Sequence, residues 1–153
     1  MEFQTKIKQL GERIKSLKES TETEEATKSA FVMPFVQALG YDVFNPNEVI
    51  PEYTADIGTK KGEKVDYAVL QNNEPIIIIE CKHWGDRLTL HGTQLQRYFH
   101  VTNAHFAILT NGIQYKFYSD LEKENKMDVK PFFQFDFENI KESSINELLK
   151  FQK

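Results

Sequence analysis

The segment PIIIIECKHW, from Pro75 to Trp84, constrains the fold more than any other part of the sequence. Four consecutive isoleucines are typical of a strand covered on both faces, so we expect it in the centre of a sheet with helices on each side. Glu80, Cys81 and Lys82 follow directly. Because side chains alternate across a strand, Glu80 and Lys82 should point to one face and Cys81 to the opposite, packed face. A carboxylate and an ammonium are therefore expected side by side at the end of the central strand.

A second acid is expected beside this pair. The run KVDYAVL has the composition of a strand, and the following QNNEP is typical of a hairpin loop. Counting back along both strands from this loop places Asp66 opposite Glu80, whereas a slip of two residues would give Asp66 a different partner, Ile78 or Lys82. Directly opposed residues have Cβ atoms about 5 Å apart, so two like charges there are destabilising unless a cation neutralises them.

The two carboxylates and the lysine predict a metal-assisted site. Carboxylates and a backbone carbonyl, here that of Cys81, are the hard oxygen ligands that Mg²⁺ takes. Near a metal-bound water, Lys82 could orient the nucleophile, assist its deprotonation and stabilise charge on a scissile phosphate. A solvated ion pair at a strand end, worth about 0–1 kcal/mol, accounts for Asp66, Glu80 and Lys82 equally well.

The segment LHGTQLQRYFHVT has helical spacing and carries two further polar candidates. Gln94 and Tyr98 are four residues apart, so an amide and a phenol share one helical face and can hydrogen-bond toward a phosphate or a catalytic residue. A partly buried tyrosine beside a surface glutamine is the structural alternative.

Taken in order, these residues resemble a known nuclease pattern. Asp66, then Glu80-Cys81-Lys82, then Gln94 to Tyr98 is similar to the PD-(D/E)XK motif followed by the QxxxY motif. More narrowly, the chain resembles the N-terminal nuclease domain of type I restriction enzyme R subunits, the HsdR N-terminal family. The segments EEATKSAFVMPFVQALGYD, VDYAVL and FAILTNGIQYKFY occur in the same order as in that family. The resemblance extends from Glu24 to Tyr118.

The resemblance implies an α/β, restriction-endonuclease-like core with a central mixed sheet, and Mg²⁺-dependent hydrolysis of DNA phosphodiester bonds, with Mn²⁺ as a substitute. It also implies a role in restriction or defence, with other restriction subunits or domains as partners. Asp66 and Glu80 would bind metal, Lys82 would be catalytic, Gln94 and Tyr98 would support the site, and Glu25 would be the upstream acid, with Glu24 as the alternative. Val65 replaces the motif's proline. The ATP-binding motif GxxxxGK(S/T) is absent from this sequence, so we expect no ATP-driven motor in it.

The composition limits the remaining classes of function. The 153 residues contain one cysteine and four histidines, which excludes an internal disulfide framework and disfavours a structural zinc site. With no apolar run of about 20 residues, we expect a cytoplasmic protein without a membrane segment. The net charge of −4 predicts a small DNA footprint. Five basic residues are candidate phosphate contacts or, equally, parts of a solvated surface: Lys60, Lys61, Lys64, Arg87 and Arg97.

The rest of the pattern indicates one domain over residues 1–153, with a helix in 1–19 and a catalytic core at about 24–118. The apolar stripe from Phe3 to Leu17 should dock on the core or, alternatively, contact a partner chain. We also expect a helix that starts with a capping box at Thr21, is kinked or broken at Pro34 and stops at Gly40. Further expectations are a hairpin at Asn111-Gly112, an edge strand at FFQFDF, and a terminal helix capped by Ser143 or Ser144. That last helical pattern reaches Lys153 without a stop signal, which is compatible with a piece of a longer protein. A catalytically silent module for DNA binding or subunit docking is the alternative function.

Overall fold

The computed structural model describes residues 2–54, 64–90, 93–124 and 126–153. Its helices are α1 (Phe3–Leu17), α2 (Glu24–Thr27), α3 (Met33–Ala38), α4 (Leu95–Val101) and α5 (Glu142–Leu148). Short 3-10 turns cover Lys18–Ser20 and Leu149–Phe151, and a π-helical turn, Lys28–Val32, joins α2 to α3. The strands are β1 (Val49–Tyr53), β2 (Val65–Gln71), β3 (Glu74–Cys81), β4 (Phe106–Thr110), β5 (Gln114–Tyr118) and β6 (Phe133–Asp136).

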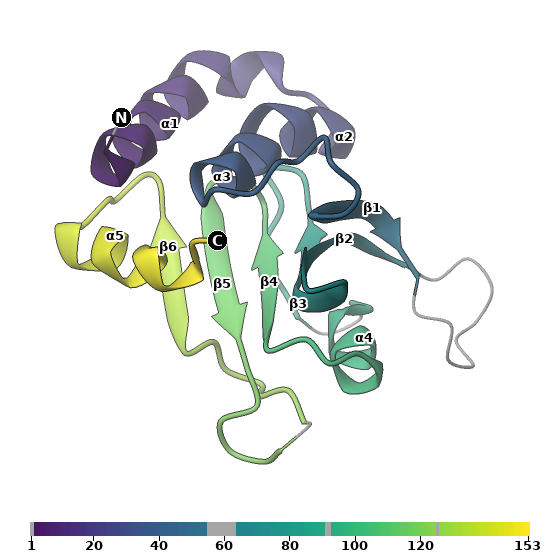
Figure 1. The fold of residues 1–153 in the computed structure, drawn as a ribbon. Helices are drawn as coiled ribbons and strands as arrows, with labels where there is room; N and C mark the ends of the chain where they lie inside the picture. Colours follow the sequence, from purple (N-terminus) through teal and green to yellow (C-terminus); the bar gives the residue numbers. More distant parts are fainter. Residues whose placement is uncertain (1, 55–63, 91–92, 125) are drawn as a thin grey trace.

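The described strands form one mixed sheet in the order β1-β2-β3-β4-β5-β6 (Figure 1). The β3–β4 pair is parallel and the others are antiparallel, because α4 carries the chain from the end of β3 back to the start of β4. The isoleucine-rich β3 is central, as predicted, and FFQFDF contains the edge strand β6. The α/β class is therefore confirmed.

The two faces of the sheet are covered by different helices, which explains the run of isoleucines in β3. On one face, Ile77, Ile79 and Cys81 pack with residues of α1, α3 and α5. On the other face, Ile78 belongs to a second buried cluster with Leu95, Tyr98 and Phe99 of α4. From Ile77 to Cys81 every residue of β3 is buried, and Glu80 is the polar residue among them. No helix among the described residues is long and apolar enough to cross a membrane.

Helix α1 lies within the predicted residues 1–19 and spans the apolar stripe, which packs on the chain's own core. Ile7 and Ile14 are buried there, and Arg13 donates a hydrogen bond from Nε to the carbonyl of Ala30 at 2.9 Å. In an α-helix that carbonyl would accept from the N–H of residue 34, which is Pro34 and has none. The stripe thus packs on the chain's own core, as the first of the two alternatives predicts.

The second helical segment begins two residues later than predicted. Its N-cap is Thr23, whose Oγ1 accepts the N–H of Ala26 at 3.0 Å. The predicted cap, Thr21, instead donates its hydroxyl to the carbonyl of Leu17 at 2.8 Å and closes the preceding turn. Pro34 does not break the segment, because it lies in the first turn of α3, directly after the π-helical turn. Gly40, at φ 100°, ends the helix as expected.

The two C-terminal predictions had different outcomes. The Asn111-Gly112 hairpin joins β4 to β5, and Gly112 has a φ of 84°, which favours glycine. Asn111 Oδ1 accepts the N–H groups of Ile113 and Gln114, which stabilises the turn. The prediction of a serine cap for α5 was wrong: Lys141 is at the N-cap position without a side-chain hydrogen bond, and both serines lie inside the helix.

Candidate active site

Polar side chains gather in a pocket of about 270 Å³ where β2 begins and β3 ends. They come from four separate segments and include Glu24, Lys64, Asp66, Glu80, Lys82 and Gln94. Larger hollows of about 390 and 410 Å³ are lined by other parts of the chain, and each has only one carboxylate in its described lining. The smaller pocket therefore has the density of ionisable groups expected of a reaction site.

The pairing of β2 with β3 brings the two predicted acids together. Tyr67 pairs with Ile79, and continuing this antiparallel register by one residue places Asp66 opposite Glu80. The backbone N–H of Cys81 donates to Asp66 Oδ2 at 2.7 Å. The thiol of Cys81 is buried in the core, so its backbone alone takes part in the site, as the alternation along β3 predicts.

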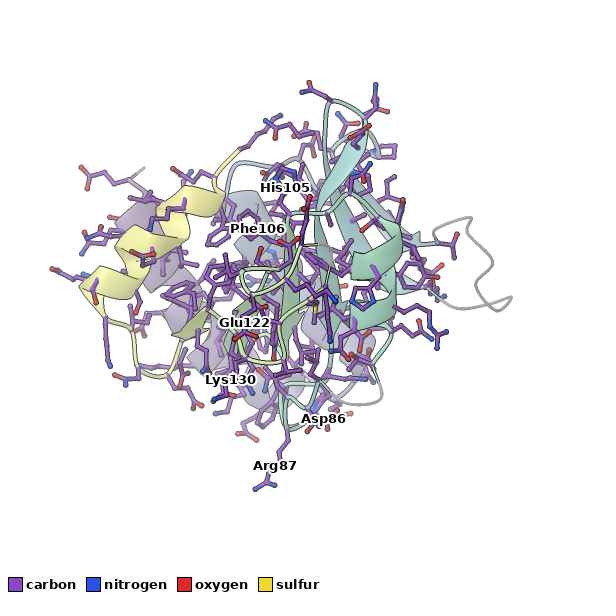
Figure 2. All side chains as sticks on the ribbon, turned by 90° about the horizontal axis from the view of Figure 1, so that it is seen from below. Asp86, Arg87, His105, Phe106, Glu122 and Lys130 are labelled. Carbon is purple, nitrogen blue, oxygen red and sulfur yellow. The ribbon has the colours of Figure 1, made fainter. Side chains whose placement is uncertain are left out.

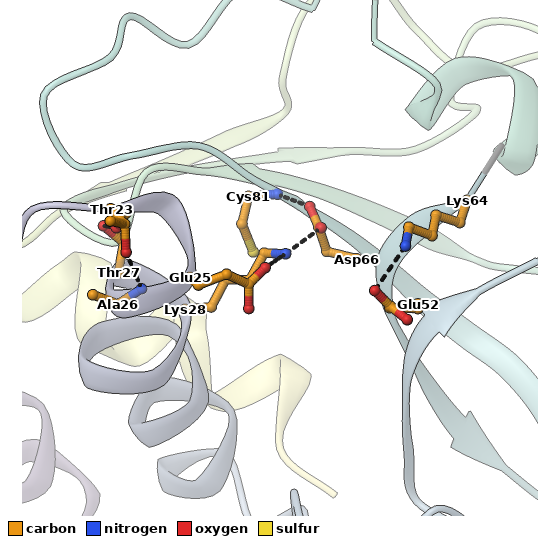
Figure 3. Close-up of polar contacts among 9 residues, drawn as sticks. All are labelled: Thr23, Glu25, Ala26, Thr27, Lys28, Glu52, Lys64, Asp66 and Cys81. Carbon is orange, nitrogen blue, oxygen red and sulfur yellow. Dashed lines mark hydrogen bonds and ion pairs between the residues drawn. The ribbon is translucent and has the colours of Figure 1, made fainter. Parts of the chain in front are cut away.

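The other oxygen of Asp66 is bonded to a lysine that the sequence analysis did not identify. Lys28 Nζ lies 2.7 Å from Asp66 Oδ1 and 2.8 Å from Glu25 Oε1 (Figure 3). Burial lowers the pKa of Lys28, but the hydrogen bonds to Asp66 and Glu25 outweigh burial and raise its pKa above the ordinary value. Lys28 is therefore a buried, charged ammonium behind the candidate metal ligand.

Glu80 is the most buried acid of the pocket, with a side chain only 10% exposed. Its Oε1 accepts the N–H of Gln94 at 3.2 Å, and its Oε2 lies 3.7 Å from Lys82 Nζ. Burial raises the pKa of Glu80, Lys82 opposes the shift, and Asp66 adds to it by like-charge repulsion. Two carboxylates thus share a partly dry space, where a further positive charge would be favourable.

Lys82 differs from Lys28 in its freedom to move. Its backbone is fixed, because its N–H donates to the carbonyl of Thr110 at 2.8 Å and continues the parallel ladder beyond β3. Its side chain is 38% exposed, lines the pocket and, among the described residues, makes a loose ion pair with Glu80. An ammonium on a fixed backbone with a free end can contact a molecule that enters the pocket.

Gln94 and Tyr98, predicted on one helical face, lie at different depths. Gln94 is the N-cap residue of α4 and lines the pocket, and its Oε1 accepts the N–H of Lys64 at 2.9 Å. The N–H of Tyr98 donates to the carbonyl of Gln94. The side chain of Tyr98 is fully buried beside Leu95 in the core. Gln94 could therefore contact a bound molecule directly, whereas Tyr98 supports α4 from within.

Of the two candidate upstream acids, the structure places Glu24 in the pocket. Glu25, the first choice from the sequence, is 82% exposed and is bonded to Lys28. Consecutive residues of a helix point about 100° apart, so only one of the two can face the pocket. Glu25 can act on the site only through Lys28.

The predicted phosphate contacts are scattered. Lys60 and Lys61 lie outside the described residues. Lys64 lines the pocket and forms an ion pair with Glu52 at 2.7 Å. Arg87 is exposed and points away from the body of the molecule (Figure 2), and Arg97 is exposed on α4. Of the three described residues, only Lys64 lines the pocket.

Two contacts that were not predicted from the sequence join the pocket to the segment that contains α2 and the turn before it. The first is Lys28, which follows Glu25 by three residues, so the helical spacing in EEATK was the available signal. The second joins the residues after Lys82 to the turn before α2: His83 Nε2 and Trp84 Nε1 both lie within hydrogen-bond distance of the carbonyl of Thr21, at 3.1 and 2.7 Å.

The donor atoms of the pocket suit a hard divalent cation. Asp66, Glu80 and the carbonyl of Cys81 supply oxygen ligands, and each carboxylate oxygen keeps a lone pair beyond its present bond. Among the described residues, no three side chains of His, Cys, Asp or Glu cluster as a ready metal site. The fit therefore depends on two carboxylates and a backbone carbonyl, with room left for water or substrate oxygens.

Comparison with known proteins identifies a family and finds solved structures with a similar fold. The family model described as type I restriction enzyme R protein N terminus (HSDR_N) matches residues 23–132. No curated protein matches the chain. A solved structure, a cryo-EM DrdV–DNA complex, is similar with a TM-score of 0.59 and 15% identity, over 100% of this chain and 14% of that one. The likeness shows a restriction-endonuclease-like fold, and the chain spans about one seventh of that larger protein.

Proposed function

Because the chain belongs to the family of type I restriction enzyme R protein N termini, we propose that it is a metal-dependent DNA endonuclease that acts in restriction or defence. The observation that carries the proposal is that Asp66 and Glu80 line one pocket at the start of β2 and the end of β3, together with the partly exposed Lys82. The family supports DNA as the substrate, and the structural relative was solved as a DNA complex. The pocket is small, which suits one phosphodiester group.

Asp66, Glu80 and the carbonyl of Cys81 would hold Mg²⁺ or Mn²⁺ in this mechanism. Such an ion supplies an acidified water and a positive charge against the phosphate oxygens. The chain itself contributes orientation. The N–H groups of Cys81 and Gln94 each fix one carboxylate oxygen, so neither acid has to be reorganised when substrate arrives.

Lys82 is proposed as the catalytic lysine. Its ammonium can orient the attacking water and stabilise the negative charge that builds on the phosphate oxygens. Gln94 can add an amide contact, and Glu24 can hold a further water at the pocket edge. Tyr98 acts through the packing of α4.

The test is cleavage of a supercoiled plasmid by the whole chain in Mg²⁺ or Mn²⁺. Wild type should nick the plasmid, and Lys82→Ala should lose about 10²–10⁴-fold in rate while its thermal midpoint stays unchanged. Lys15→Ala removes an exposed lysine from α1 and is the matched control, which should cleave like wild type. Full activity in Lys82→Ala would refute the proposed mechanism.

One observation favours a second role. Asp66 and Glu80 each have a lysine partner, Lys28 and Lys82, so their charges are partly balanced without metal. A module without catalytic activity that binds DNA or other restriction subunits would need no metal, so it is consistent with these partly balanced charges. The plasmid experiment separates the two roles, because a silent module produces no nicks with either metal.

A further inference from the structure

We infer that Lys28 is a positioning residue that holds Asp66 in a fixed orientation and weakens the pocket's affinity for divalent cations by offsetting one negative charge. This inference depends on the proposed function, because it concerns the same metal ligands. It assigns separate tasks to the two lysines of the site. Lys82 faces the pocket and meets the reacting groups, whereas Lys28 acts only through Asp66.

The first support is the geometry around Asp66. Lys28 Nζ contacts Oδ1 at 2.7 Å and the N–H of Cys81 contacts Oδ2 at 2.7 Å, so both oxygens are bound by different parts of the fold. One contact comes from the helical segment and the other from β3. A carboxylate held at both oxygens cannot rotate freely, which keeps its remaining lone pairs in one arrangement.

The second support is the location of Lys28. Its side chain is 11% exposed, compared with 38% for Lys82, and it is absent from the pocket lining that the structure describes. Lysine is almost never fully buried unless it is paired, so this position is a costly place for a charge that had no task. Lys28 also begins the π-helical turn, a distortion frequent at functional sites.

The third support is the direction of the electrostatic effect that the Lys28 charge would have on a divalent cation at Asp66. An ammonium 2.7 Å from the carboxylate of Asp66 would repel a divalent ion held by that carboxylate, and even at the dielectric constant of water the repulsion would weaken binding on the order of tenfold. The other partner, Glu25, lies 2.8 Å from the same ammonium, but its side chain is 82% exposed, so water weakens this ion pair and Glu25 offsets the Lys28 charge only in part. Removing the Lys28 charge should consequently tighten metal binding, although it loosens Asp66.

The experiment measures Mn²⁺ affinity by electron paramagnetic resonance for wild type, Lys28→Met, Lys28→Gln, Lys28→Arg and Lys15→Met. Lys28→Met removes the charge and the hydrogen-bond donor. Lys28→Gln removes the charge but keeps a donor for Asp66, and Lys28→Arg keeps the charge. Lys15→Met is the control, because it removes one exposed positive charge from α1, outside the described lining of the pocket. Plasmid nicking at saturating Mn²⁺ is measured in the same proteins, and thermal melts establish that each is folded.

We expect Lys28→Met and Lys28→Gln to bind Mn²⁺ about tenfold more tightly, and Lys28→Arg and Lys15→Met to remain within about twofold of wild type. Nicking should fall in Lys28→Met, so affinity and rate move in opposite directions, whereas a merely structural lesion weakens both. If Lys28→Met does not fold, the Mn²⁺ affinity of Lys28→Gln tests the inference. Unchanged or weaker binding in folded Lys28→Gln, with wild type binding and cleaving, would overturn this inference alone; a wild type that neither binds Mn²⁺ nor cleaves would overturn the proposed function as well.

Discussion

The backbone N–H of Cys81 donates a 2.7 Å hydrogen bond to Oδ2 of Asp66, while the thiol of the same residue is buried on the opposite face of the sheet. One residue thereby connects the core to the site. Its side chain packs with Ile79 and Tyr115, and its backbone orients a candidate metal ligand. Because β3 is rigid, its backbone holds the side chain of Asp66 in place, and the thiol does not contribute to this contact.

The Cys81 thiol should be unreactive in the folded protein. Burial raises its pKa well above the ordinary value, and the thiolate is the reactive form. At pH 8, a chromogenic disulfide reagent should leave the thiol of the native protein unlabelled. In denaturant, it should label one thiol per chain. Rapid labelling of the folded chain would show that β3 is not packed as described.

Glu80→Gln should stabilise the protein at alkaline pH. Burial raises the pKa of Glu80 in the folded state, so its contribution to stability is greatest below the ordinary pKa of 4.5 and is lost as the pH rises through the raised value. The free energy of unfolding of Glu80→Gln should therefore exceed that of wild type at pH 8 and approach it near pH 4.

Thermal unfolding at the two pH values measures this difference. Glu12→Gln, which changes a side chain 77% exposed on α1, is the control and should show no comparable dependence. A Glu80→Gln variant less stable than wild type at pH 8 would contradict the assigned cause, because it would mean that the carboxylate is favoured in the folded state.

Gly112→Ala should be strongly destabilising. A Cβ at this position would lie 3.0 Å from Phe31 Cβ and Thr27 Cγ2, and the φ of 84° disfavours a side chain. Overpacking and the left-handed backbone together cost about 2–4 kcal/mol, which lowers the thermal midpoint by roughly 5–15 °C. Gly85→Ala, whose Cβ would meet only the His83 ring, is the control. A midpoint within about 2 °C of wild type for Gly112→Ala would refute the close approach.

Thr23→Ala tests where the second helical segment begins. The lost N-cap hydrogen bond should cost about 1 kcal/mol, or roughly 2–4 °C in the thermal midpoint. Thr5→Ala, on the exposed side of α1, should change the midpoint by much less. Equal effects of the two substitutions would argue against capping by Thr23.

The sequence predicted the central strand and the opposed acids because both depend on patterns within a few residues. The run of isoleucines identified β3, and the hairpin composition placed Asp66 beside Glu80. The turn itself is shorter than predicted, since Asn72 and Asn73, both with positive φ, form it alone. A register shift between Val69 and Leu70 compensates, so the pairing near the site is the predicted one.

The contact of Lys28 with Asp66 could not be predicted in the same way. The two residues are 38 positions apart in the sequence, and their meeting depends on how the helical segment crosses the sheet. The choice between Glu24 and Glu25 has the same difficulty, because it depends on where the helix begins. Thr21 matched a capping pattern with Glu24, but the chain closes a 3-10 turn there and starts α2 at Glu24 instead.

The measurement that tests the central claim most directly is the anomalous diffraction of a crystal of the whole chain soaked in Mn²⁺. The metal-dependent mechanism predicts a peak between the carboxylates of Asp66 and Glu80, near the carbonyl of Cys81. A saturating soak that leaves this pocket without a peak would contradict the metal-dependent mechanism and favour the silent module.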